Sequence, residues 1–163
     1  LMARAFRYSA DYLPDENDQR PTMGAIGPES SRRARSFAVW ATLKAYGREG
    51  QQRVVEHCLD ITQHFAEKVR EADDFELMND PHLNVVSFRY NPGGMGDDAL
   101  DQLNEALGEA VLADGRFLVG TSKMGARTIF RPAFSNWRIR EEDVEEMLEV
   151  IREVANRQKD QQG

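Results

Sequence analysis

Residues 84–92 read NVVSFRYNP, a short run rich in residues that favour strands, and it stops at Asn91-Pro92-Gly93-Gly94. Val86 and Phe88 are typical of a strand, whereas the Pro-Gly pair is typical of a turn. The run therefore predicts a strand over residues 84–90. A shorter strand is predicted just before it, over residues 75–78.

The sequence beyond residue 92 alternates between helical and strand patterns. Apolar residues recur at helical spacing over 97–113, and Gly115 follows as a helix stop. Strands are predicted over 116–120 and 126–131, with a turn over 122–125 between them. A last helix over 141–156 begins with acidic residues, which suit the positive end of a helix dipole.

Two helices are predicted before the first strand. One covers residues 31–46 and ends at Gly47, and the next covers 50–72 with a broad apolar stripe. The whole order is a helix pair followed by strand, strand, helix, strand, strand, helix, an α+β arrangement. Such a fold does not define a function by itself.

Composition limits the range of functions. The chain has 163 residues, 40% of them hydrophobic, and is long enough for one compact domain. Its net charge of −7 argues against a nucleic-acid partner. The one basic cluster, Arg32, Arg33 and Arg35, is interpreted as a solvated helix start rather than an anion site. No run of apolar residues is long enough to span a membrane.

The remaining single features are interpreted structurally. Cys58 is the lone cysteine, so no internal disulfide is expected, and its apolar neighbours indicate a buried thiol in a reducing, cytoplasmic setting. His57 and His64 are seven residues apart, too far for a usual pair of metal ligands, and His82 follows a proline in a turn. No metal site is expected. No signal-peptide pattern opens the chain, so a soluble, cytoplasmic protein is expected. Because position 1 is not an initiator methionine, a trimmed or cut chain is also expected.

Three segments carry a family resemblance. Residues 30–50, SSRRARSFAVWATLKAYGREG, resemble the arginine-pair helix of group II pyridoxal-phosphate-dependent amino-acid decarboxylases. Residues 84–92 are similar to a strand of that family's C-terminal domain. Residues 128–151, TIFRPAFSNWRIREEDVEEMLEVI, are similar to its final strand and helix. Their order and spacing also match, so the resemblance extends over nearly the whole chain.

The resemblance implies the C-terminal portion of a fold type I pyridoxal-phosphate enzyme of the α/β class. It implies a mobile active-site loop at 1–30, connecting helices at 31–73 and a small α+β domain at 74–163. The family forms homodimers with the active site at the subunit interface, and its substrates are amino acids.

The family's cofactor, pyridoxal 5'-phosphate, is bound covalently by a lysine that follows a histidine. None of the four lysines here, Lys44, Lys68, Lys123 and Lys159, follows a histidine. The cofactor-binding lysine is therefore expected on the N-terminal, large-domain polypeptide of the same enzyme. This chain alone is expected to be inactive.

Tyr12, in the loop YSADYLPDE, matches the mobile-loop tyrosine of these decarboxylases. A phenol is protonated at neutral pH because its ordinary pKa is about 10. It can therefore donate a proton to the substrate's α-carbon after carbon dioxide leaves. Tyr8 is the rival for this role, because loop alignments slip. A tyrosine also favours simple decarboxylation, since aldehyde-forming relatives tend to carry phenylalanine there.

Two further residues are candidates through the resemblance. Arg131 ends a predicted strand just before Pro132, where its guanidinium can hold a substrate carboxylate in a bidentate manner. The alternative is an arginine at a strand edge in water or in an ion pair. Ser31 starts the predicted first helix, where it can contact the cofactor phosphate. Ordinary helix capping explains Ser31 equally well.

Two other classes of function remain open. Another pyridoxal-phosphate reaction, such as aldehyde synthesis or transamination, uses the same scaffold. A non-catalytic dimerisation or binding domain is the second class. Part of a larger enzyme should expose an apolar surface where the missing portion packs. That surface is expected on the first helix, at Phe37, Trp40 and Leu43.

Overall fold

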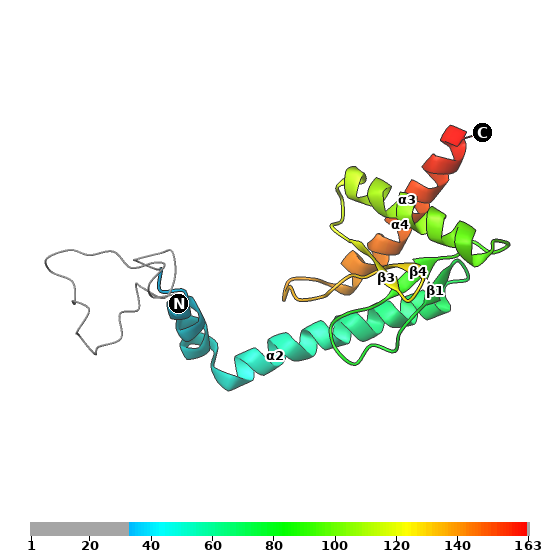
Figure 1. Ribbon diagram of the computed structural model, residues 1–163. Coiled ribbons are helices and arrows are strands. Elements are labelled where there is room, and N and C mark those ends of the chain that lie inside the picture. The colour runs from blue at the N-terminus through cyan, green and yellow to red at the C-terminus, as the bar shows by residue number, and fades with distance from the viewer. Residues whose placement is uncertain (1–32, 163) are drawn as a thin grey trace, which may run out of the picture. The chain divides into compact units, whose positions relative to one another are not determined.

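The computed structural model describes residues 33–162, and side chains through residue 160. The chain divides into two compact units, Leu1–Gly47 and Arg48–Gly163, and each is described by itself. Figure 1 shows the order of the elements along the chain. Within the described residues, no helix is both long and apolar enough to cross a membrane.

Helix α2 covers Ser36–Glu71 and is interrupted at Gly47, whose φ of 63° and ψ of −169° are not helical. Positive φ is strained for residues with a Cβ, so glycine is suited to this position. The predicted end of a first helix at Gly47 is therefore confirmed. The part of α2 that precedes Gly47 belongs to the first unit, and the part that follows it belongs to the second.

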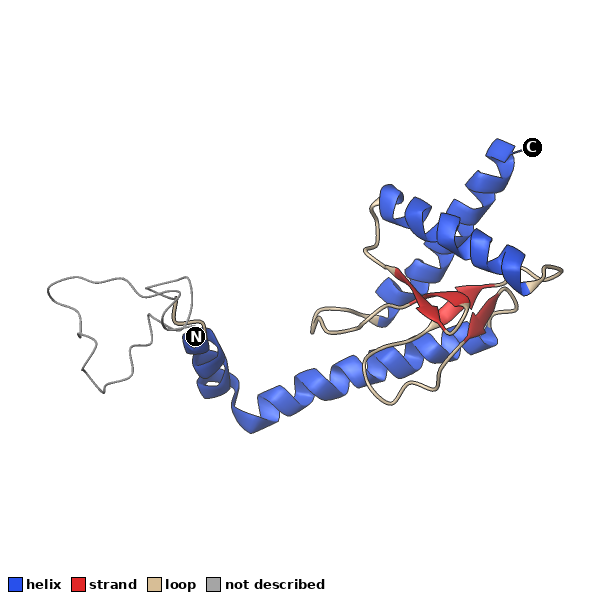
Figure 2. Ribbon diagram, in the orientation of Figure 1, coloured by secondary structure: helices blue, strands red, loops and turns tan. Residues whose placement is uncertain are grey.

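The second unit contains the rest of the predicted order. After α2 come β1 (Phe75–Leu77), β2 (Phe88–Tyr90), α3 (Asp97–Asp114), β3 (Thr121–Met124), β4 (Arg127–Phe130) and α4 (Glu141–Gln162). The strands form one antiparallel sheet in the order β1-β2-β4-β3. In the view of Figure 2 the strands lie between α3 and the C-terminal half of α2. The predicted strand-strand-helix-strand-strand-helix order is confirmed.

The predicted strand over 116–120 is wrong. Those residues form no strand, and β3 instead occupies Thr121–Met124, where a turn was predicted. The pairing is set by a two-residue turn at 125–126, which makes Met124 the partner of Arg127 and Thr121 the partner of Phe130. Gly125 has a φ of 62°, as required at the first position of a common two-residue hairpin turn.

The predicted strand over 84–90 is shorter than expected. Only Phe88–Tyr90 is a strand, preceded by an isolated bridge between Val85 and Ala133. The backbone N–H of Ser87 donates to the side chain of Asn79 over 2.7 Å instead of to a strand. A side-chain acceptor therefore replaces part of the ladder.

The core of the second unit is built on aromatic rings. Phe65 of α2 meets Phe88 of β2 and Phe134 edge-on, with ring centroids 5.3 and 5.2 Å apart. Phe88 also stacks on Phe130 of β4 at 5.4 Å. Edge-to-face and offset-stacked pairs at these distances are favourable. Apolar residues of α3 and α4 complete the same cluster, among them Leu107, Val111, Ile151 and Val154.

The Asn104 side chain of α3 replaces backbone hydrogen bonds of the sheet where β2 separates from β4. Its Oδ1 accepts from the Tyr90 N–H over 2.8 Å, and its Nδ2 donates to the Tyr90 carbonyl over 2.9 Å. The side chain is fully buried. Since buried backbone groups must be paired, this amide satisfies two groups that no neighbouring strand reaches.

Replacing Asn104 with leucine should lower the free energy of unfolding by about 2–4 kcal/mol, because both Tyr90 backbone groups would be buried without a partner. Urea unfolding measures the change. Gln102→Leu on the exposed side of α3 is the matched control and should change it by less than about 0.5 kcal/mol. Equal effects of the two substitutions would show that the Asn104 bridge does not stabilise the fold.

Candidate functional site

Arg131 lies directly after β4, with its side chain exposed. Its backbone N–H donates to the Gly120 carbonyl over 3.1 Å, and the carbonyl of the next residue, Pro132, accepts from Val86 over 3.2 Å. Among the described carboxylates, none forms an ion pair with Arg131. The backbone is therefore held on both sides while the guanidinium faces solvent, an arrangement that leaves it open to an external carboxylate.

The segment after Arg131 is held from two sides. Asn84 bonds to Phe134 twice, accepting from its N–H over 2.8 Å and donating from Nδ2 to its carbonyl over 3.2 Å. Farther along, His57 Nε2 donates to the Ile139 carbonyl over 2.7 Å. Between these anchors Trp137 is 62% exposed, with the Arg138 guanidinium 4.9 Å above its ring. The segment thus presents Arg131, Trp137 and Arg138 on a fixed backbone.

Two of the three histidines have structural partners in the second unit. His57 holds the Ile139 carbonyl, and His64 Nε2 lies 3.0 Å from Glu145 Oε1 on α4. Both contacts connect α2 to the N-terminal end of α4. Within the described range, no three His, Cys, Asp or Glu side chains gather as they would around a metal ion. Cys58 is buried, as predicted.

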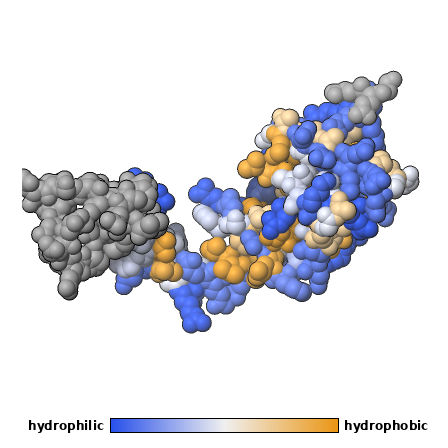
Figure 3. All heavy atoms as spheres, in the orientation of Figure 1, coloured by the Kyte–Doolittle hydropathy of each residue, from blue (hydrophilic) through white to orange (hydrophobic). Residues whose placement is uncertain are grey.

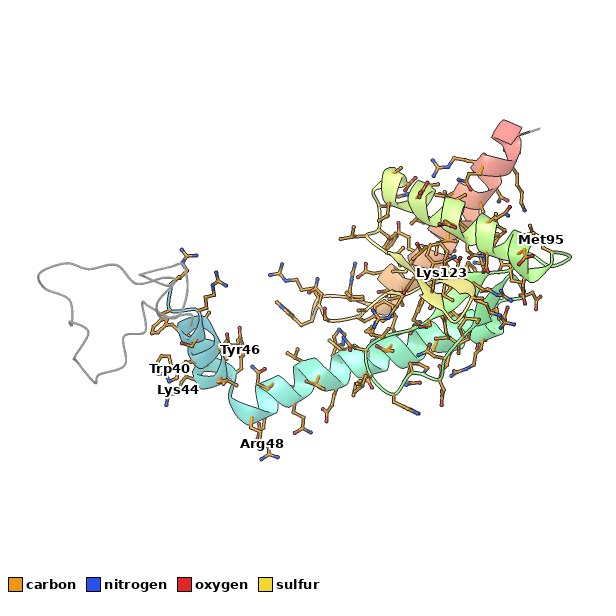
Figure 4. The ribbon with its side chains drawn as sticks, viewed as in Figure 1. Trp40, Lys44, Tyr46, Arg48, Met95 and Lys123 are labelled. Atoms are coloured by element: carbon orange, nitrogen blue, oxygen red, sulfur yellow. The ribbon has the colours of Figure 1, made fainter. Side chains whose placement is uncertain are left out.

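A covalently bound pyridoxal phosphate needs a lysine with surroundings that accept a phosphate group. Lys68 pairs with Glu145 at 3.4 Å, and Lys123 donates from Nζ to Thr128 Oγ1 over 2.6 Å. Lys44 and Lys159 are exposed on helices, and Figure 4 shows Lys44 and Lys123 on separate elements. The hollow of about 290 Å³ beside Lys68 is lined by Glu71, Glu145 and Glu149.

Three carboxylates around one lysine and one arginine repel a phosphate group. The surroundings of Lys68 therefore do not fit a covalently bound pyridoxal phosphate.

Several predicted site residues lie outside the described range. Tyr12, Tyr8, Ser31 and Arg32 are among them, so their roles stay predictions. Arg33 is described and exposed.

Two charged groups in the second unit were missed from the sequence. Arg89 of β2 is 4% exposed and donates to Glu76 over 2.7 Å and to Asp97 over 3.0 Å. Arg152 of α4 forms a bidentate pair with Asp74 at 2.7 and 2.8 Å and lies over the Phe75 ring. Their partners are 8 to 78 residues away along the chain and lie on other elements, so no local pattern marks them.

The predicted apolar surface on the first helix is confirmed. Within the first unit, Phe37, Trp40 and Leu43 are 67%, 55% and 51% exposed, and the first two rings lie 5.6 Å apart. An isolated helix of this length is marginal in water unless its apolar side packs against something. The helix before Gly47 therefore presents a surface suited to contact with other protein.

Sequence comparison matches residues 1–91 to the family described as the pyridoxal-dependent decarboxylase conserved domain. Among curated proteins, the chain is 24% identical over 157 residues to an aromatic-L-amino-acid decarboxylase of Bacillus atrophaeus, covering 94% of this chain and 32% of that protein. It is 26% identical over 125 residues to an L-2,4-diaminobutyrate decarboxylase of Acinetobacter baumannii, covering 75% and 24%.

Solved structures agree on the fold. The glutamate decarboxylase domain of a Vibrio parahaemolyticus diaminobutyrate decarboxylase protein matches with a TM-score of 0.67 and 28% identity, over 73% of this chain and 25% of that one. Tryptophan decarboxylase of Catharanthus roseus matches with a TM-score of 0.69 and 20% identity, over 94% and 31%.

The architecture is therefore that of a portion of fold type I pyridoxal-phosphate decarboxylases. The chain belongs to the pyridoxal-dependent decarboxylase family and corresponds to a C-terminal portion of it. It spans about a quarter to a third of the length of the relatives it matches.

The Asp74–Arg152 pair predicts a pH dependence of stability. Hydrogen bonds from Arg152 lower the pKa of Asp74 below its ordinary value of 3.8. A carboxyl group with a lowered folded-state pKa stabilises the fold above the unfolded value, and this contribution is lost as the pH falls through the folded value. Asp74→Asn should therefore lower the free energy of unfolding by about 1 kcal/mol at pH 7 and reduce its loss on acidification.

Urea unfolding between pH 7 and pH 3 measures both effects. Asp80→Asn is the control, because the Asp80 side chain is 76% exposed and makes one hydrogen bond, to Arg70. An Asp74→Asn variant with the pH profile of the unsubstituted chain would contradict the linkage.

Proposed function

We propose that this chain is the C-terminal part of a pyridoxal-phosphate-dependent L-amino-acid decarboxylase, a carboxy-lyase that releases carbon dioxide and an amine. The observation that carries the proposal is the family match over residues 1–91, a range that includes Tyr12. Curated relatives that decarboxylate aromatic L-amino acids, L-2,4-diaminobutyrate and tyrosine support the reaction type.

The cofactor lysine is proposed to lie on the large-domain polypeptide of the same enzyme, so that this chain alone is inactive. The misfit between pyridoxal phosphate and the surroundings of Lys68 supports this division. The assembled enzyme is proposed to be a cytoplasmic homodimer. Pyridoxal phosphate supplies the electron sink for breaking the bond to the carboxyl carbon when it is bound.

Within this enzyme, Tyr12 is proposed to donate a proton to the substrate's α-carbon, and Arg131 to hold a substrate carboxylate. The exposed guanidinium on a fixed backbone supports the second role. The carboxylate it holds is either the α-carboxylate or one in the substrate side chain. Ser31 is proposed as a contact of the cofactor phosphate.

Aldehyde synthesis is the second candidate reaction. A phenylacetaldehyde synthase of Arabidopsis thaliana is 24% identical over 125 residues, so the same family includes it. Tyrosine at position 12 favours decarboxylation over this reaction. A non-catalytic dimerisation or binding domain is the third candidate, because the exposed aromatic rings of the helix before Gly47 suit contact with another protein in that case too.

Replacing Tyr12 with phenylalanine in the assembled enzyme should lower amine formation about 100-fold or more, because a positioned proton donor is lost. Chromatography of the products from a panel of amino acids measures amine and aldehyde separately. Tyr8→Phe is the matched variant and should retain amine formation. If Tyr8→Phe abolishes it instead, the roles of the two tyrosines are exchanged, and if neither does, Tyr12 is not the proton donor.

Replacing Arg131 with glutamine should raise KM for the substrate by about 10-fold to 100-fold, since a charge-assisted contact with a carboxylate is removed. Arg140→Gln is the control, because Arg140 is exposed on the same segment and pairs with Asp143. Steady-state kinetics with the amino acid that releases carbon dioxide provides the comparison. An unchanged KM for Arg131→Gln would exclude this arginine from substrate binding.

A further inference from the structure

An apolar groove lies in the second unit, on the part of α2 that follows Gly47. Its volume is about 300 Å³, and its lining is formed by Val54, Val55, Cys58 and Leu59 of α2, with Leu83 and Phe134 opposite. Figure 3 shows hydrophobic surface over this stretch of α2. It is separate from Arg131 and from the hollow beside Lys68.

The groove is open although its residues suit burial. Val54, Val55 and Leu83 are 40%, 58% and 71% exposed, while Phe134 at its base is 3% exposed. Farther along α2 the same kind of side chain is buried against the sheet, as Phe65 and Val69 show. The helix therefore extends its apolar side beyond the sheet that covers it.

The surroundings of the groove resemble the edge of a protein interface. Arg48, Gln51, Gln52 and Glu56 border a second hollow beside it, which shares Val55. An apolar centre with a polar rim is the usual anatomy of a stable interface between proteins. Stable interfaces within one enzyme are also the more hydrophobic ones.

The length of the relatives identifies the occupant. About two thirds to three quarters of each relative has no counterpart in this chain. Most of the groove lining, from Val54 to Asn84, lies within the range that matches the family, whereas Phe134 lies beyond it. A surface of the family's own fold that is apolar and open therefore fits the remaining portion of that fold.

We propose that the groove of Val54, Val55, Leu83 and Phe134 is a docking site for an apolar segment of the large-domain portion of the same enzyme. This rests on the proposed function for the identity of the partner. The groove binds that portion by burying the exposed valines and Leu83, and the polar rim fixes its position.

Photo-crosslinking tests the proposal in the assembled enzyme. A p-benzoylphenylalanine at position 55 is compared with one at position 112, because Leu112 is a 45% exposed apolar residue on α3 that does not line the groove. The tagged chain is expressed in the organism that encodes it, irradiated, and its adducts are identified by peptide mass spectrometry. Position 55 should yield an adduct with a family-matching segment outside residues 1–163, and position 112 should yield none.

Three outcomes overturn the proposal: no adduct from position 55, an adduct with residues 1–163 of a second copy, or the same adducts from both positions. Carbon dioxide release by the same preparation tests the proposed function separately. A preparation that releases carbon dioxide but fails to crosslink at position 55 rejects the docking site alone. An adduct with the large-domain portion but no carbon dioxide release keeps the docking site and rejects decarboxylation.

A pair of substitutions gives an independent measurement. Val55→Asp should weaken retention of the large-domain portion by about 10-fold or more, because a charge would enter an apolar contact. Leu112→Asp should retain it. Circular dichroism checks that both variants keep their helices, and equal retention by both would contradict the proposal.

Discussion

The contact of Phe65 with Phe88 and Phe134 is the interaction on which the second unit depends. It fixes α2 against the sheet, with ring centroids 5.3 and 5.2 Å apart. Phe88 in turn packs against Phe130 and Phe75. Because Phe134 belongs to the segment after β4, the same contact also fixes the chain near Arg131. The candidate substrate contact and the core therefore share one packing arrangement.

The polar groups around this core follow from the short strands. A strand of three residues leaves backbone groups that no neighbour reaches, and Asn104 and Asn79 supply side-chain partners to them. His57 and Asn84 hold the segment after β4 in the same manner. These hydrogen bonds hold the backbone without any additional strand. The Arg131 side chain therefore stays in solvent although its backbone is held.

The helical part of the fold is predictable from the sequence because it depends on local spacing. Gly47 and Gly115 mark helix ends that the structure confirms. The strand predicted over 116–120 fails for a physical reason. Val119 is buried and Leu118 is 95% exposed, which is the alternation of a strand, yet the turn at Gly125 sets the pairing farther along the chain.

The candidate site is predictable in part. Arg131 is recognised from its place before Pro132 and from the family resemblance, and it does lie exposed at the end of β4. The roles of His57 and Arg89 are not predictable, because their partners lie on other elements, 8 to 82 residues away, where no local pattern links them. The groove on α2 is also hidden from the sequence, since Val54 and Phe65 belong to one apolar pattern and differ only in what covers them.

We propose that this chain contributes a C-terminal part to the enzyme while the covalent cofactor site lies elsewhere. Incubation of the 163-residue chain with equimolar pyridoxal phosphate, borohydride reduction and peptide mass spectrometry test it directly. None of the four lysines should carry a stoichiometric adduct, whereas in the assembled enzyme one lysine outside residues 1–163 should carry it. A one-to-one adduct on Lys44, Lys68, Lys123 or Lys159 would contradict it.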